Sequence, residues 1–313
     1  MESLKLSFES IMPIFILMLV GYVLKSLKFA DKKTFDAINK FVFRVFLPVL
    51  LFYNIYKTES SQIFDPKLIF FTIGAVLVTF VAGYFIVKLI TKDNARRGVI
   101  LQGFFRSNFA ILGVPLADYI CGEHTTGLTS LMVAVVVPTF NVLAVICLER
   151  FRDGNVNFKK LIKGIITNPL IIGCAIGLVF FVSGIKLPAI LEKSVSDISK
   201  VATPLSIIVL GASFTFSSLK GYVRDVLIIN SARLIIVPLI MLTAAVLIGF
   251  RGEALVCLLV AFGSPVAVSS FAMAQQMGGD EKLAAQAVVT TSAFCLVTLF
   301  VWIFALNSLG LFY

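Results

Sequence analysis

Apolar residues dominate ten stretches of the chain, each long enough to cross a lipid bilayer as a helix. A span of about 20 apolar residues covers the hydrocarbon core of a membrane. Polar and charged residues are concentrated in the short segments between the stretches. The pattern therefore predicts an all-α polytopic membrane protein with ten transmembrane helices. We expect them at residues 8–27, 37–56, 67–90, 97–121, 126–148, 161–183, 198–216, 223–248, 254–277 and 283–306.

The composition agrees with a chain embedded in lipid. Hydrophobic residues make up 59% of the 313 residues, charged residues make up 14%, and the mean hydropathy is +1.00. Soluble domains are about 45–50% apolar and about 25% charged. The residues before the first apolar run include Glu2, Lys5 and Glu9 and lack the basic bias of a signal peptide. We therefore expect the first stretch to be a retained span.

Basic residues give the chain a formal net charge of +10. They are spread over short loops and not gathered on a soluble face, so they do not indicate a nucleic-acid partner. With the N-terminus outside, sixteen of the 27 Lys and Arg residues fall in cytosolic loops and seven in outer loops. Loops rich in Lys and Arg face the cytosol. We expect a multi-pass protein of the cell (plasma) membrane, surrounded by the lipid bilayer, with both termini outside the cytosol.

Three landmarks recur in the two halves of the chain in the same order. A proline stands eight positions before a glycine in spans one and six, a proline lies in spans two and seven, and G-x-P-[LV]-A lies in spans four and nine. Coincidence is the alternative, because glycine and proline are ordinary in membrane helices. Three matches in order favour an internal repeat. The landmarks are Pro13–Gly21 and Pro169–Gly177, Pro48 and Pro204, and Gly113–Ala117 and Gly263–Ala267.

The repeat divides the chain into two halves. We expect residues 1–148 to form a first five-helix repeat, residues 149–160 a cytosolic linker, and residues 161–313 a second five-helix repeat. Because five is an odd number, the second repeat enters the membrane from the opposite face and is inverted. Inverted repeats with interrupted helices at matching positions point to the binding site of a secondary transporter.

Pro115 and Pro265 are expected to break the fourth and ninth helices, since proline removes a backbone donor and clashes with the preceding turn. Gly113 and Gly263 allow the backbone to unwind there. Freed backbone groups in hydrocarbon cost several kcal/mol unless protein or water meets them. We therefore expect both breaks to line one cavity, where the positive end of a half-helix suits a carboxylate. Two simple proline kinks are the alternative.

Amide and hydroxyl side chains near the breaks are the candidate substrate ligands. Asn108 precedes Pro115 by seven residues, about two turns, which places both on one helix face. Serine in a membrane helix often bonds only its own backbone, so each serine alone is weak evidence. The other candidates of this kind are Ser264, Ser269, Gln275 and Asn141.

Two arginines lie deep within predicted spans, Arg106 in the fourth and Arg233 in the eighth. A charge inside the membrane usually faces a cavity or a partner, and snorkelling to the interface is the alternative for each. Acidic partners are scarce, with Asp118 near the outer end of the fourth span and Asp36 at the inner start of the second. A cavity with basic and amide groups and few carboxylates favours an anion.

The chain lacks patterns for metal or covalent chemistry. Its five cysteines are scattered without metal or disulfide spacing, and its one histidine, His124, lies in a short loop. No serine has a nearby histidine or convincing lysine base. We therefore expect no metal, no cofactor and no catalytic residue, and we do not favour a membrane-embedded enzyme.

NFAILGVPLA at 108–117 resembles the helix 4 motif of the auxin efflux carrier family, which includes plant PIN-formed carriers and bacterial malate and malonate permeases. KVATPLSIIVLGASF at 200–214 is similar to the family's helix 7, and the resemblance covers essentially the full chain. It implies a bile-acid-symporter-like fold of two inverted five-helix repeats, in which broken helices 4 and 9 cross at the substrate site. It also implies that Asn108 is a substrate ligand and that Pro115 and Pro265 mark the crossing. The long central loop of plant members is absent, as in the short bacterial branch.

These observations together predict a secondary transporter that moves a small organic anion, an auxin-like acid or a dicarboxylate, by alternating access. A membrane sensor or regulatory subunit that uses the carrier fold to bind a carboxylate without transporting it is the alternative. The substrate, the direction, the coupling ion and a homodimeric arrangement stay open.

Overall fold

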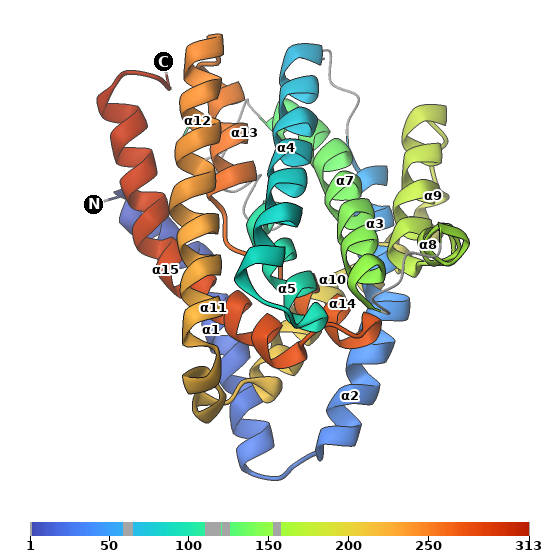
Figure 1. Ribbon diagram of the computed structural model, residues 1–313. Helices are drawn as coiled ribbons and strands as arrows, with labels where there is room; N and C mark the ends of the chain where they lie inside the picture. The colour runs from blue at the N-terminus through green and yellow to red at the C-terminus, as the bar shows by residue number, and fades with distance from the viewer. Residues whose placement is uncertain (1, 59–64, 110–119, 121–125, 153–157, 313) are drawn as a thin grey trace.

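The computed structural model describes residues 2–58, 65–109, 120, 126–152 and 158–312. The regular elements in these ranges are helices, as the sequence predicts. Figure 1 shows most of them running side by side, with α8 seen end-on at the edge of the molecule beside α9. The elements are α1 (Glu2–Ser26), α2 (Lys32–Phe41), η1 (Val42–Phe46), α3 (Leu47–Tyr56), α4 (Pro66–Ile90), α5 (Asn94–Phe105), α7 (Thr126–Arg152), α8 (Phe158–Ile166), α9 (Pro169–Ser183), α10 (Ala189–Ser213), α11 (Phe216–Ser231), η2 (Ala232–Ile236), α12 (Val237–Ile248), α13 (Gly252–Gly263), α14 (Ser269–Met277) and α15 (Glu281–Ser308).

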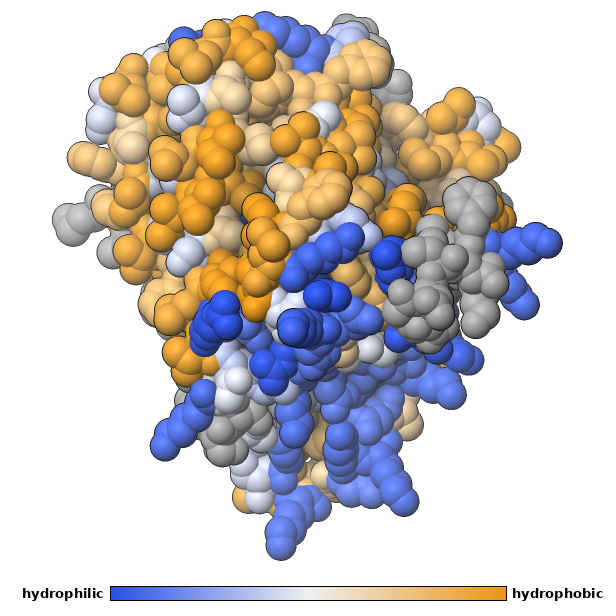
Figure 2. Space-filling view, in the orientation of Figure 1, coloured by the Kyte–Doolittle hydropathy of each residue, from blue (hydrophilic) through white to orange (hydrophobic). Residues whose placement is uncertain are grey.

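The surface is that of a multi-pass membrane protein. Among the described helices, five are long and apolar enough to cross a bilayer, and three more are apolar but shorter. Figure 2 shows apolar side chains over the upper part of the visible face and hydrophilic ones at the lower end, around α2. We call this the hydrophilic end. The five long spans are Pro66–Ile90, Leu131–Arg152, Ala189–Ser213, Lys220–Ile248 and Glu281–Ser308.

Aspartate side chains begin several helices of the hydrophilic end. Asp31, Asp93 and Asp280 accept hydrogen bonds from backbone N–H groups in the first turns of α2, α5 and α15. The first N–H groups of a helix have no partner within it, so a side-chain acceptor at this position stabilises the helix by about 1 kcal/mol. These caps fix where each helix starts.

Prolines break or locally distort helices that hydropathy alone predicts as regular. The expected span 161–183 is two helices, because Pro169 disfavours a helical residue before it and the Asn168 side chain caps Leu170 N at 2.9 Å. Pro48 and Pro238 each follow a π-helical turn, η1 and η2 respectively. Such turns accommodate the hydrogen bond that proline cannot donate.

Glycines allow two pairs of helices to approach closely. An added Cβ on Gly21 of α1 would lie 1.9 Å from the Ile208 carbonyl oxygen of α10, and one on Gly211 of α10 would lie 2.0 Å from the Met18 oxygen of α1. In the second pair, a Cβ on Gly173 of α9 would lie 2.4 Å from the Pro48 oxygen of α3. Small residues at these positions let the backbones pack together, as is common between membrane helices. The helices α1, α3, α9 and α10 form a panel through these contacts.

We expect Gly21→Ala to destabilise the protein, because the added methyl group meets backbone atoms that cannot move without separating α1 from α10. Overpacking of this kind costs about 1–3 kcal/mol or more. The midpoint of thermal unfolding in detergent measures the effect. Gly74→Ala in α4 is the control, since no atom lies within 4 Å of its added Cβ. Equal midpoints for the two variants would contradict the close approach.

Candidate functional site

One helical segment of the second half is interrupted around Pro265. Helix α13 ends at Gly263 and α14 begins at Ser269, so residues 264–268 lie outside both helices. Ser264 is extended, with φ −70° and ψ 156°. The break expected at Pro265 is therefore present in the structure.

A second interruption lies in the first half, and it begins earlier than the sequence predicts. Helix α5 ends at Phe105, and Arg106 is extended with φ −90° and ψ 112°. The expectation of a helix from residue 97 that breaks at Pro115 is wrong at this point, because the helix stops ten residues before that proline. Pro115 and Gly113 lie outside the described residues.

The two interruptions contact each other through their backbones. Ser107 and Val266 form an antiparallel β-bridge, and Asn108 N donates to the Pro265 oxygen at 2.9 Å. Val266 N donates to Thr291 Oγ1 of α15 at 3.2 Å. Several backbone groups freed from the helices thus find partners within the protein, as a membrane interior requires. This pairing explains why the extended segment begins at Arg106.

Arg233 joins the ends of the two half-helices. It is fully buried in η2, and its Nε and Nη2 donate to the oxygens of Ser264 at 2.8 Å and Ala261 at 2.7 Å, at the end of α13. Its Nη1 donates at 3.4 Å to the oxygens of both Phe104 and Phe105, at the end of α5. The last carbonyls of a helix lack partners and carry partial negative charge. One guanidinium therefore neutralises two helix ends, and the alternative of snorkelling is excluded.

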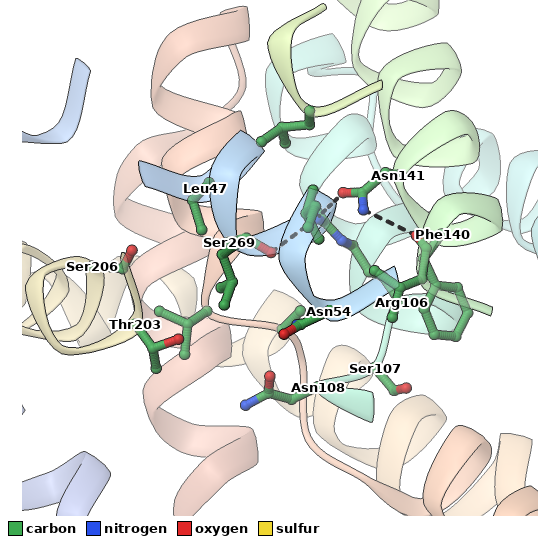
Figure 3. Close-up of a pocket in the computed structure, with 16 residues that line it drawn as sticks. Leu47, Asn54, Arg106, Ser107, Asn108, Phe140, Asn141, Thr203, Ser206 and Ser269 are labelled. Carbon is green, nitrogen blue, oxygen red and sulfur yellow. Dashed lines mark hydrogen bonds between the residues drawn. The ribbon is translucent and has the colours of Figure 1, made fainter. Parts of the chain in front are cut away.

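Arg106 is also buried, with 3% of its surface exposed. Its Nη2 donates to Asn141 Oδ1 of α7 at 2.7 Å and to Ser269 Oγ of α14 at 2.8 Å, and its Nη1 donates to Gln102 Oε1 at 3.1 Å. Figure 3 shows the guanidinium between Asn141 and Ser269. Among the described residues, no carboxylate lies within 4 Å of it, and Asp118 is outside them. The charge is held by neutral groups.

A cavity of about 60 Å³ lies beside Arg106. It separates the interrupted segments from the panel and is large enough for a few water molecules. No aspartate or glutamate is among the described residues that line it. We call it the central cavity (Figure 3). Its lining residues are Leu47, Leu50, Leu51, Asn54, Arg106, Ser107, Asn108, Val137, Phe140, Asn141, Leu170, Thr203, Ser206, Ala267, Val268 and Ser269.

Two buried polar groups of the central cavity have no hydrogen-bond partner in the described structure. They are Nδ2 of Asn108, a residue 5% exposed, and the hydroxyl of Ser107. A buried donor without a partner costs about 1–3 kcal/mol. Such groups next to an arginine that no described carboxylate neutralises are suited to hold a ligand that accepts hydrogen bonds and carries negative charge.

Comparison with known proteins shows the family of the chain. The sequence profile of a family described as membrane transport protein matches residues 6–155 and again residues 154–303. The chain belongs to this family, that of the auxin efflux carriers. The double match covers almost the whole sequence and agrees with the expected internal repeat.

Several relatives of this family member bear transporter names. An "Uncharacterized transporter" of Methanocaldococcus jannaschii is 27% identical over 303 residues, covering 94% of this chain and 97% of the relative. An "Uncharacterized transporter" of Escherichia coli K12 is 21% identical, covering 94% and 96%. A "Putative malonate transporter" of Rhizobium meliloti is 22% identical and covers 92% of both chains. The chain is thus similar to transporters along its full length.

The structure brings four of the predicted site residues of this family member to the central cavity: Arg106, Asn108, Asn141 and Ser269. Two others, Ser264 and Pro265, lie in the interruption and contribute backbone contacts, and Gly263 is the last residue of α13 before it. Gln275 is elsewhere. It bonds Asn39, Asp36 and Glu281 at the hydrophilic end.

Several cavity residues were not among the predicted site residues. Thr203 and Ser206 lie one and two positions from Pro204, which the sequence marks only as a landmark of the repeat. Ser107 stands beside the predicted Asn108, and Asn54 lines the same cavity from α3. The proximity of Thr203 and Ser206 to a repeated proline is the signal that points to them. Within the described residues, no group of three His, Cys, Asp or Glu side chains is placed to hold a metal ion.

We expect Arg233→Gln to lower the midpoint of thermal unfolding by several degrees, since at least two of the buried carbonyl bonds at 2.7–2.8 Å are lost or weakened. Arg233→Lys should be intermediate, because an ammonium keeps the charge but cannot span both helix ends. The control is Arg224→Gln, an exposed arginine on the same helical segment. A wild-type midpoint for Arg233→Gln would contradict its role between α5 and α13.

Proposed function

We propose that this family member is a secondary transporter that moves a small organic anion across the cell membrane by alternating access. The observation that carries the proposal is the central cavity, which is lined by the buried Arg106 and by Asn108, whose amide Nδ2 has no hydrogen-bond partner among the described residues. A carboxylate would accept charge-assisted hydrogen bonds from both. The transporter names of the full-length relatives support the same function, and one of these names specifies malonate.

In the proposed anion site, the hydrogen-bond partners of the Arg106 guanidinium are neutral side chains. Asn141 and Ser269 orient the Arg106 guanidinium through acceptor oxygens and leave its charge uncompensated by the described residues. Ser269 is also the first residue of α14, whose N-terminal end carries partial positive charge. The N-terminal end of α14 and the Arg106 guanidinium are both positive, so together they favour an anion between or beside them. The site is therefore proposed to bind carboxylates more tightly than neutral molecules of the same shape.

The proposed movement takes place between two parts of the protein. One part is the panel of α1, α3, α9 and α10, and the other contains the interrupted segments with Arg233. The panel contains an equivalent contact twice, each time between one half of the chain and the other, because α1 packs on α10 through Gly21 and α9 packs on α3 through Gly177 and Gly173. This equivalence supports ten spans in two inverted five-helix repeats, with the interrupted segments as the crossing helices 4 and 9. Inverted repeats supply the two symmetry-related states that alternating access needs.

The proposed orientation follows the distribution of basic residues. The hydrophilic end carries the α1–α2 connection with its lysines, and loops rich in lysine face the cytosol. We propose that this end is cytosolic in the cell membrane and that both termini lie on the other side.

We expect Asn108→Ala to reduce malonate flux in proteoliposomes by about tenfold to a hundredfold, the value of one lost hydrogen bond to a charged ligand. Because Asn108 Nδ2 has no hydrogen-bond partner among the described residues, the thermal midpoint of the ligand-free variant should stay close to wild type. Asn307→Ala, at an exposed asparagine near the end of α15, is the control. Undiminished flux in Asn108→Ala would contradict its role, and binding without flux in the wild type would favour the sensor.

The charge of the ligand provides a second test. Malonate should raise the thermal midpoint of the wild-type protein, and malonamide, its neutral diamide, should not. A ligand at 100 times its dissociation constant adds about 2.7 kcal/mol. Arg106→Gln should abolish the malonate shift, because the amide carries no charge. Equal shifts with malonate and malonamide would contradict an anion site.

A further inference from the structure

A second cavity, of about 350 Å³, lies at the hydrophilic end. Four helical elements surround it: the last turn of α1, the start of α2, the end of α10 and the start of α15. It contains three lysines and two carboxylates, and we call it the lysine vestibule. Its lining residues are Lys25, Lys32, Phe35, Asp36, Ala212, Ser213, Thr215, Glu281 and Lys282.

The lysine vestibule lies further along the same helices that line the central cavity. On the continuous helix of α2, η1 and α3, the vestibule residue Asp36 is eleven positions from the cavity residue Leu47, or about 16 Å. On α10, the vestibule residue Ser213 is seven positions from the cavity residue Ser206, or about 10 Å. Both helices therefore lead from the central cavity to the vestibule.

Gln275 of α14 occupies the level between the two cavities. Its Nε2 donates to Asp36 Oδ1 of α2 at 2.9 Å and to Glu281 Oε2 of α15 at 2.8 Å. Its Oε1 accepts a hydrogen bond from Nδ2 of Asn39, a residue with no exposed surface. The Gln275 amide thus joins α2, which continues into α3 of the panel, with α14 and α15, which follow the second interruption.

The charges of the lysine vestibule are only partly compensated. Lys32 Nζ pairs with Glu281 Oε1 at 3.0 Å, and this hydrogen bond raises the pKa of Lys32 above its ordinary value and keeps it protonated. Asp36 receives its hydrogen bond from the neutral Gln275 amide. Among the described residues, neither Lys25 nor Lys282 has a carboxylate within 4 Å of its ammonium group. Lysines gathered in a cleft raise the local concentration of anions.

We propose that the lysine vestibule is a second binding site for organic anions, with Lys25 and Lys282 as its cationic groups, and that the Gln275 bonds are the barrier between it and the central cavity. The proposal rests on the proposed transport of an anion through the central cavity and adds a second station to the same route. Its ligand carries at least one carboxylate, since two ammonium groups meet it. Breaking the Gln275 bonds opens the route from the vestibule to Arg106.

The anion site is tested without transport by thiol labelling of the purified full chain. Ser213→Cys places a thiol in the vestibule, and its reaction rates with a sulfonate-bearing and a trimethylammonium-bearing methanethiosulfonate are compared by mass spectrometry. Lys25→Gln with Lys282→Gln should lower the anion-to-cation rate ratio by tenfold or more, since each unit charge at about 4 Å in water changes the rate of one reagent by about fivefold. Lys33→Gln, an exposed lysine of the same end outside the lining, is the control. An unchanged ratio in the double variant would overturn the site.

The barrier is tested with a thiol in the central cavity. Thr203→Cys should react several-fold faster with the anionic reagent in inside-out membrane vesicles when Gln275→Ala is added. Gln276→Ala, at the neighbouring glutamine, is the matched control and should leave the rate unchanged. Equal rates for Gln275→Ala and its control would overturn the barrier.

Malonate flux separates this proposal from the proposed function. In vesicles of known sidedness, Lys25→Gln with Lys282→Gln should raise the half-saturating malonate concentration several-fold on the hydrophilic side only. If wild-type vesicles move malonate and the double variant is unaltered on that side, the vestibule proposal fails alone. If wild-type vesicles move none of the carboxylates offered, the proposed function fails, and the labelling ratio still decides whether the vestibule binds anions.

Discussion

Backbone groups inside a membrane must find partners within the protein, and this requirement shapes the centre of the molecule. Two helices stop there, which leaves carbonyl and N–H groups without their helical bonds. The β-bridge between Ser107 and Val266 satisfies part of them, and the single side chain of Arg233 satisfies carbonyls at both helix ends. The negative ends of two helix dipoles converge on one guanidinium. A charge that is unfavourable in lipid is therefore stabilised by these carbonyls and holds the two helix ends together.

The same arrangement leaves polar groups free for a ligand. Arg233 donates its hydrogen bonds to backbone carbonyls. Arg106 donates to the neutral side chains of Asn141, Ser269 and Gln102, and it borders the central cavity. Two buried arginines therefore have different roles. One holds the interruption in place, and the other supplies a positive charge that no described carboxylate cancels. The division explains how a broken helix pair can be stable and still offer a binding site.

Much of this site follows from local sequence. Pro265 and the nearby Gly263 predict the second interruption. Asn108, Asn141 and Ser269 were predicted as site residues because they are amide and hydroxyl side chains within predicted spans, and they line the cavity. The early end of α5 did not follow, because no proline stands there. It depends on pairing with residues about 160 positions away. The role of Arg233 was open for the same reason, since its carbonyl partners lie on α5 and α13. Gln275 was predicted as a ligand because it follows the second interruption in the sequence. Its distance from the cavity depends on how α14 packs against α2, which the local sequence does not specify.

The central claim is that an anion binds between Arg106 and Asn108 beside two paired interruptions. A structure of the protein determined in a lipid nanodisc with malonate tests it most directly. The account predicts a carboxylate in contact with the Arg106 guanidinium and the Asn108 amide, with Arg233 still against the ends of α5 and α13. Malonate bound away from Arg106, or a continuous helix through residues 264–268, would contradict it.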